Sequence, residues 1–300
     1  MLICPVCAAP LAREERAFRC ANGHSFDMAR QGYIHLVGSR HPGDTKPMLQ
    51  ARRAFLAAGH YRPLADALAD LALAYLASHL AMRPAHASPP AMLDAGCGEG
   101  YYIGQLCRAL AEAGIPARCF GLDVAKEAVR MAATRDLGVQ FLVADIKGRL
   151  PFADASLDVL LNVFAPRNPA EFARVLASGG LLLIAIPAPA HLAELRAILP
   201  LLAIEDQKRE RVLAQFAGSF ALAASHDLEY ELALMPAEAR LLLSMTPSHR
   251  QLDTEEMERA LPAAPLRVTA AFSMLALARG VAPDTVNGKG NAPSSGEDGA

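Results

Sequence analysis

The feature that most constrains the fold is a glycine-rich segment at residues 94–100, with the sequence Asp-Ala-Gly-Cys-Gly-Glu-Gly. It follows the apolar residues 91–93 and precedes a helical pattern that begins at Tyr101. Glycines let the main chain approach a ligand closely, and the free amides at a helix start favour anionic groups. The segment therefore predicts a strand that turns into a helix through a ligand-binding loop, as in open α/β sheets.

The spacing of the glycines indicates which class of ligand the turn would bind. Dinucleotide-binding turns carry G-x-G-x-x-G, whereas this segment carries G-x-G-x-G behind an aspartate, which is typical of enzymes that bind S-adenosylmethionine (SAM). The alternatives are NAD and a strand-to-helix turn that holds no ligand. The segment contributes four candidate cofactor-binding residues: Asp94, Gly96, Gly98 and Gly100.

Two further aspartates stand where apolar runs end. Asp123 ends the run 119–122, at 23 residues after Gly100, which is close to the spacing of carboxylates that accept ribose hydroxyls. Asp145 ends the run 139–144, where an acceptor could take the adenine amino group. Asp123 could instead cap the next helix. With the glycine turn, they predict three strand ends at one edge of a parallel sheet.

A cluster of cysteines near the start predicts a metal site. Cys4, Cys7, Cys20 and His24 form a C-x2-C, x12, C-x3-H array, which suits one tetrahedral Zn²⁺ with a filled coordination shell. A segment this short cannot bury enough apolar surface to fold unaided, so the metal would supply folding free energy. The alternative is a reduced cysteine cluster without metal.

Alternating apolar and helical segments define the body of the chain. Strands are expected near 91–95, 118–122, 139–144, 157–163 and 180–186, with helices near 101–113, 125–135 and 169–177. The last third adds helices near 190–200, 205–217 and 237–245 and a closing antiparallel pair, 220–234 with 266–278. The alternation therefore predicts an α/β fold with a mostly parallel, seven-stranded sheet and a small N-terminal zinc ribbon. With the glycine turn, the expected form of this fold is a Rossmann-like class I SAM-dependent methyltransferase.

We expect four parts along the chain. Residues 1–37 form a zinc-binding, RNA-recognising domain, 38–60 a linker and connecting helix, 61–279 the methyltransferase domain, and 280–300 a disordered tail rich in Gly, Pro and Ser.

Charge is distributed unevenly along the 300 residues. Residues 1–62 hold nine Lys/Arg against four Asp/Glu, a balance of +5, and the remainder carries −7. The N-terminal part is therefore the expected anion binder, and Arg13, Arg16, Arg19 and Arg30 could contact RNA phosphates. An ordinary solvated surface is the alternative. No apolar run approaches the roughly 18 residues of a membrane span, so a cytoplasmic protein without membrane contact is expected.

A loop after the fourth body strand is the expected acceptor site. Asn162 could bond a base edge, Phe164 could stack on a base, and Arg167 could hold a phosphate. Each has a structural alternative: Phe164 could belong to the core, and Asn162 could satisfy backbone groups at the strand end.

Several motifs together resemble the bacterial 23S ribosomal RNA guanine-N1 methyltransferases, over roughly residues 1–278. They are the cysteine array with Ser25-Phe26-Asp27, Arg30-Gln31-Gly32-Tyr33, Ala51-Arg52-Arg53, Gly59-His60-Tyr61-Arg62-Pro63-Leu64, the glycine turn, and residues 162–168. The resemblance implies a zinc ribbon that helps to recognise a 23S rRNA hairpin, a methyl transfer from SAM to guanine N1, and a homodimer.

The resemblance also implies residue roles. The zinc ligands would be Cys4, Cys7, Cys20 and His24, and the SAM contacts Tyr61, Gly98, Glu99, Asp123 and His191. Family branches modify guanine 745 or guanine 748, the second linked to macrolide resistance. Residues 162–168 favour the 748 branch, whereas residues 97–102 look more like the other.

Two other functions remain open at this point. One is methylation of a small molecule, which leaves the zinc array and the basic excess unexplained. The other is a non-catalytic zinc-ribbon RNA-binding protein, which the intact glycine turn disfavours. No residue stands out as the base that removes the guanine N1 proton.

Overall fold

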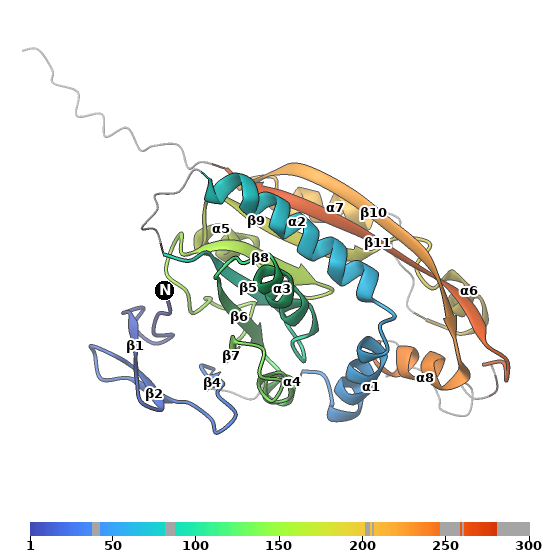
Figure 1. Cartoon of the computed structure of the whole chain (residues 1–300), viewed down its shortest axis with the longest axis horizontal. Coiled ribbons are helices and arrows are strands. Elements are labelled where there is room, and N and C mark those ends of the chain that lie inside the picture. Colours follow the sequence, from blue (N-terminus) through green and yellow to red (C-terminus); the bar gives the residue numbers. More distant parts are fainter. Residues whose placement is uncertain are drawn as a thin grey trace, which may run out of the picture.

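The computed structural model describes residues 1–37, 43–81, 88–201, 205, 207–246, 259 and 261–280. Its centre is an eight-stranded sheet with the order β10-β11-β9-β8-β5-β6-β7-β4 (Figure 1). The body strands are β5 (Ala91–Ala95), β6 (Arg118–Asp123), β7 (Val139–Val143), β8 (Leu157–Val163), β9 (Leu176–Pro187), β10 (Phe220–Leu234) and β11 (Leu266–Arg279). Strands β4 to β9 run parallel, and β11 and β10 close the sheet antiparallel.

Helices cover both faces of this sheet. They are α1 (Lys46–Ala57), α2 (Arg62–Leu80), α3 (Tyr101–Glu112), α4 (Lys126–Ala133), α5 (Pro169–Val175), α6 (Ala193–Ile198), α7 (Lys208–Phe216) and α8 (Pro236–Ser244). Alternate strand residues enter two apolar cores. Met92 packs with α2 and α3, whereas its neighbour Leu93 packs with α5 and α7. Figure 1 shows α2 and α3 in front of the sheet.

The first 37 residues form a small three-stranded antiparallel sheet and one added strand. The sheet contains β1 (Leu11–Glu14), β2 (Ala17–Cys20) and β3 (Ser25–Asp27), and β4 (Ile34–His35) follows. Ile34 and His35 of β4 pair in parallel with Leu142 and Val143 of β7. The predicted seven strands are therefore those of the methyltransferase body, and the N-terminal part adds an eighth at its edge.

Prediction and structure agree on the order of the elements and differ at some boundaries. The strand expected near 180–186 begins at Leu176, directly after α5, and passes through Gly179 with a φ of +73°. Part of the predicted linker, residues 38–42, lies outside the described residues, as does the tail from 281 to 300. In the described part of the chain, no helix has both the length and the apolar character required to cross a membrane.

Candidate functional site

The glycine turn joins β5 to α3 at the carboxyl edge of the sheet. The amide of Gly98 donates to Oδ2 of Asp123 at 2.9 Å, and the amide of Ala125 donates to Oδ1 at 2.8 Å. Burial raises the pKa of Asp123, and the two amides oppose that rise. Asp123 therefore fixes the turn and the start of the α4 segment, and each oxygen keeps a further lone pair for a ligand hydroxyl.

The three glycines of the turn have different roles. A Cβ on Gly96 would lie 2.4 Å from the Cβ of Ala165, so this glycine permits the acceptor loop to pack on the turn. A Cβ on Gly100 would press on Phe141 at 3.0 Å. At Gly98 only the guanidinium of Arg52, at 3.4 Å, comes near. Gly98 is thus the position where the main chain is open to a ligand.

Asp94 places an unpaired carboxyl group beneath this turn. Its side chain is 1% exposed, and neither oxygen accepts a hydrogen bond of normal geometry in the described structure, although the backbone amide of Ile103 is near enough to oppose the rise in its pKa. Burial, followed by the negative charge of Asp123, raises the pKa of Asp94 to about 7. A buried carboxyl group without a partner is unfavourable, so a positively charged ligand would be stabilised here.

Glu99 is also buried but already has a cationic partner. Arg135 donates to its Oε2 at 2.6 Å, while Oε1 remains without a partner among the described residues. Burial raises the pKa of Glu99, and Arg135 opposes that rise. One oxygen of Glu99 is therefore available to a ligand.

Tyr61 and His191 meet although 130 residues separate them. Tyr61 Oη lies 3.3 Å from His191 Nε2, and the amide of Ala271 donates to His191 Nδ1 at 3.3 Å. Because a backbone amide can only donate, the ring proton lies on Nε2, and the Tyr61 hydroxyl accepts it. Burial lowers the pKa of His191 to about 4, so the imidazole is neutral at pH 7. The Tyr61 hydroxyl is left free to donate its own proton.

Asp145 follows β7 and accepts a hydrogen bond from the amide of Lys147 at 2.9 Å. This contact closes a local turn at the carboxyl edge of the sheet, beside the end of β6.

The predicted acceptor loop is held against the glycine turn. Asn162 is fully buried, and its side-chain amide donates to the carbonyls of Ala95 and Pro166 at 3.1 and 2.9 Å. Both donor hydrogens are used on backbone groups, whereas Oδ1 has no partner among the described residues. Asn162 therefore acts as a clamp that ties the loop to the end of β5.

Phe164 and Arg167 lie further along this loop. Phe164 is 43% exposed, has a φ of +52°, and contacts the rings of Phe272 and Tyr102 at centroid distances of 5.6 and 6.4 Å. A positive φ is strained for an aromatic residue. Arg167 has a buried Nε without a partner among the described residues, and burial lowers its pKa.

The N-terminal cysteine array forms a compact cluster. The ligand atoms of Cys4, Cys7, Cys20 and His24 all lie within 4.8 Å of one another. Cys7 and Cys20 sulfurs are 3.7 Å apart, and Cys20 Sγ is 3.4 Å from His24 Nδ1. A tetrahedral Zn²⁺ with bonds of ~2.3 Å to sulfur and ~2.0 Å to nitrogen requires separations of about 3.8 and 3.5 Å. The donor set and its spacing fit structural zinc.

Several residues at the site were not assigned a role from the sequence. Phe272 of β11 contacts the rings of Tyr61, His191 and Phe164. Arg52 of α1 reaches the turn at Gly98 and pairs with Asp44 at 2.6 Å. Phe272 lies in an apolar strand without a distinguishing pattern, and Arg135 follows an ordinary amphipathic helix. For Arg52, its place beside Arg53 on a helix before the turn was the available signal.

Comparisons with known proteins agree with this geometry. Residues 2–41 match a zinc-ribbon family described as RlmA, N-terminal, and residues 93–184 match a methyltransferase domain family. The 23S rRNA (guanine(748)-N(1))-methyltransferase of Streptomyces fradiae is 38% identical over 88% of this chain and 91% of that protein. A protein of Micromonospora griseorubida, provisionally named a 23S rRNA (guanine-N(1)-)-methyltransferase, is 41% identical over 91% of this chain and 95% of that protein. The chain therefore belongs to the family of 23S rRNA (guanine-N1)-methyltransferases.

Proposed function

We propose that this protein transfers a methyl group from SAM to N1 of a guanine in a hairpin loop of 23S rRNA. The observation that carries the proposal is the direct packing of the acceptor loop on the glycine turn, through Ala165 on Gly96 and the clamp at Asn162. Methyl transfer requires donor and acceptor in line at short range, and this packing brings their two binding elements together.

The residues around the glycine turn fit SAM. The open main chain at Gly98, the lone pairs of Asp123 and the local turn at Asp145 suit the nucleoside part. The unpaired carboxyl of Asp94 and the free oxygen of Glu99 suit the positive charge of the cofactor. Bound SAM supplies an electrophilic methyl group on a sulfonium.

Tyr61 and His191 would position the amino-acid part of SAM. The neutral His191 donates to Tyr61, which directs the Tyr61 hydroxyl proton away from His191 toward an acceptor. A neutral imidazole adds no cationic repulsion beside a sulfonium, which agrees with the lowered pKa of His191.

On the acceptor side, Phe164 offers an exposed ring that is supported from behind by Phe272 and Tyr102. Stacking on such a ring is worth about 1–3 kcal/mol per base and is a common way to hold an unstacked purine. Arg167, with an unpartnered and buried Nε, would bind a phosphate beside that base.

The target nucleotide is proposed to be guanine 748, the position named for the S. fradiae relative. The similarity of residues 162–168 to that branch supports this choice, and modification of guanine 748 would link the protein to macrolide resistance. The test is reverse-transcription mapping with mass spectrometry of 23S rRNA from cells with and without the gene. N1 methylation that disappears from guanine 748 supports the proposal, a loss at guanine 745 moves the target, and identical methylation patterns refute the function.

The homodimer and the cytoplasmic location implied at the sequence level are part of the same proposal. Sedimentation of the purified protein at several concentrations tests the first. Fractionation of cells that express a tagged chain tests the second.

A further inference from the structure

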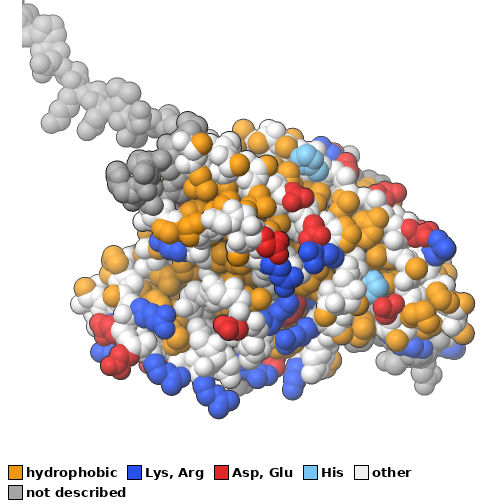
Figure 2. Space-filling model, in the orientation of Figure 1, with side chains coloured by type: hydrophobic (Ala, Val, Ile, Leu, Met, Phe, Trp, Pro, Cys, Tyr) orange, Lys and Arg blue, Asp and Glu red, His pale blue; other side chains and the backbone are white. Residues whose placement is uncertain are grey.

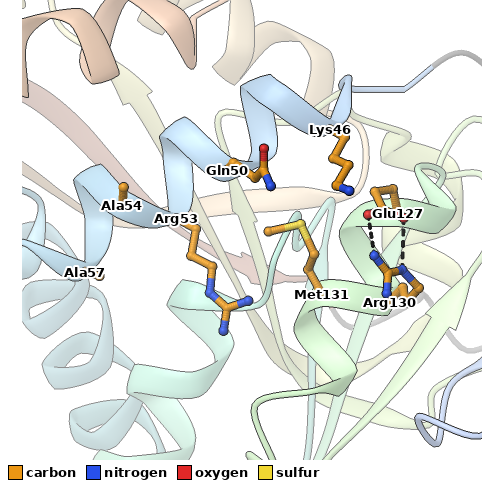
Figure 3. Close-up of a pocket in the computed structure, with 8 residues that line it drawn as sticks. All are labelled: Lys46, Gln50, Arg53, Ala54, Ala57, Glu127, Arg130 and Met131. Atoms are coloured by element: carbon orange, nitrogen blue, oxygen red, sulfur yellow. Dashed lines mark hydrogen bonds and ion pairs between the residues drawn. The ribbon is translucent and has the colours of Figure 1, made fainter.

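A groove between α1 and α4 carries an excess of positive charge. Lys46, Gln50 and Arg53 line it from α1, and Glu127, Arg130 and Met131 line it from α4, around a volume of about 430 Å³. Figure 3 shows these side chains on facing sides of one depression. Such a volume is large enough for one nucleotide unit.

The charges in this groove are only partly balanced. Its single carboxylate, Glu127, accepts from Arg130 Nε at 3.0 Å and from Nη2 at 2.6 Å, so this pair is internally neutral. Neither Lys46 nor Arg53 forms a direct ion pair among the residues that the structure describes; their charges act at longer range, Lys46 on the pKa of Glu127 and Arg53 on that of Glu99. The groove therefore presents a net charge of +2, from three cations and one carboxylate.

The groove is a fixed part of the fold. Leu49 of α1 packs with Ala125, Ala128 and Met131 of the α4 segment in a small separate core. Because side chains on both helices are held by this contact, the distance between Arg53 and Arg130 does not depend on a flexible loop.

The groove lies between the zinc-ribbon part and the glycine turn. Helix α4 packs on β7, and β7 pairs with β4, the strand that ends the zinc-ribbon part. On the other side, Arg52, the neighbour of Arg53, reaches the glycine turn at Gly98. Figure 2 shows Lys and Arg side chains gathered along the lower edge of the molecule, over the region that Figure 1 assigns to the ribbon, α4 and α1.

We propose that this groove binds backbone phosphates of the RNA strand that runs from the zinc ribbon to the methyl-transfer site, with Lys46 and Arg53 as the phosphate ligands. The inference rests on the proposed function for the identity of the RNA. Cations that are not held in direct ion pairs and lie on a fixed surface are a common way to set the register of a nucleic acid backbone. A second depression, of about 320 Å³ between α2 and α3, holds Arg62 and Arg108 with Asp66, Asp70 and Glu112, and its excess of acidic groups does not suit phosphate.

The test measures how RNA affinity depends on salt. A labelled hairpin fragment of 23S rRNA that contains the target guanine is titrated with the full chain at several KCl concentrations. The slope of log affinity against log salt is negative. Lys46→Ala and Arg53→Ala should each make it less steep by about 1, because each variant loses one phosphate contact. Glu127→Gln should make the slope steeper, since it removes the carboxylate that lines the groove and frees Arg130 to bind phosphate.

Arg108→Ala is the matched control, because Arg108 is an exposed arginine of the mixed-charge depression on α3. It should leave the slope unchanged. SAM affinity is measured on every variant by calorimetry, because Arg53 also acts on the pKa of Glu99 at the glycine turn. Slopes that match the wild type in Lys46→Ala and Arg53→Ala overturn the proposal, as does a slope that becomes less steep by the same amount in Arg108→Ala.

Failure of this inference can be told apart from failure of the proposed function. If wild-type protein methylates the rRNA but the groove variants keep the wild-type salt slope, the groove proposal is refuted and the function stands. If the variants change the slope as expected but cells without the gene retain all N1 methylation, the groove binds RNA and the function is refuted.

Discussion

At Gly98 a single backbone conformation determines whether a ligand can approach the main chain. The residue has a φ of +54°, and the space beside it is limited by Arg52 alone. Gly98→Val would place a branched side chain in that space and in a backbone region that costs it about 1–3 kcal/mol. We expect SAM affinity to fall more than tenfold in calorimetric titration.

Gly114→Val is the control for the free-energy cost of placing valine at a positive φ. Gly114 also has a positive φ, +68°, and nothing lies within 4 Å of its Cβ position. This variant should lose a similar amount of stability and keep its affinity for SAM. Equal SAM affinity of Gly98→Val and wild type would contradict the assignment of the glycine turn as the SAM-binding site.

Asp94 and His191 have pKa values shifted in opposite directions, to about 7 and about 4. Between pH 4 and 6.5 the native chain holds a proton on Asp94 and none on His191, whereas the unfolded chain does the reverse. The two contributions to the pH dependence of stability therefore cancel in this window.

A substitution that removes one of these two groups should expose the contribution of the other to the pH dependence of stability. Relative to wild type, Asp94→Asn should make the free energy of unfolding rise with pH between about 4 and 6.5, and His191→Gln should make it fall from about pH 4 to 7. Each slope should reach at most about 1.4 kcal/mol per pH unit. Urea unfolding of the cofactor-free protein across this range measures both, and slopes of the same sign would contradict the assignment.

Phe164 combines an exposed aromatic ring with a positive φ of +52°. We expect Phe164→Ala to lower kcat/KM for the RNA hairpin by about 5-fold to 150-fold, through loss of base stacking worth about 1–3 kcal/mol. Phe164→Trp should retain most activity, and SAM affinity should not change in either variant. An Ala variant with wild-type kinetics would assign the ring a packing role only.

At the level of elements, the short strands β1 to β3 form around the metal ligands. Cys20→Ala removes one thiolate of four ligands, and the remaining set cannot close a tetrahedral site. We expect the purified variant to lose its zinc and the ribbon to unfold before the body in a thermal melt. Cys107→Ala, outside the cluster, should keep one zinc per chain, and unchanged metal content in Cys20→Ala would refute the ligand assignment.

In the whole molecule, β4 makes the ribbon an extension of the central sheet. Ile34 is fully buried where β4 pairs with β7, and it belongs with Leu142 to the apolar core that contains Leu93. Ile34→Ala should lower the free energy of unfolding by about 2–4 kcal/mol. Because the ribbon then loses its fixed position, RNA affinity should fall while SAM affinity is retained.

Val6→Ala is the corresponding surface control in the ribbon. Val6 is 65% exposed, so its truncation should change stability by no more than about 0.5 kcal/mol. RNA and SAM affinities measured side by side on the two variants test whether the junction, rather than the ribbon alone, determines RNA binding. Unchanged RNA affinity in Ile34→Ala would refute this role of the junction.

The sequence by itself predicted the order of strands and helices, the glycine turn and the cysteine-histidine cluster, because these depend on local spacing: alternation along a strand, glycines within one turn, and three cysteines and a histidine within 21 residues. Tertiary structure decided what depends on distant pairs. Only folding brings Tyr61 to His191 and Phe272, joins β4 to β7, and ties the side-chain amide of Asn162 to Ala95 and Pro166. Periodicity reports which face of an element is buried, but the partner on that face is chosen by packing across the sheet.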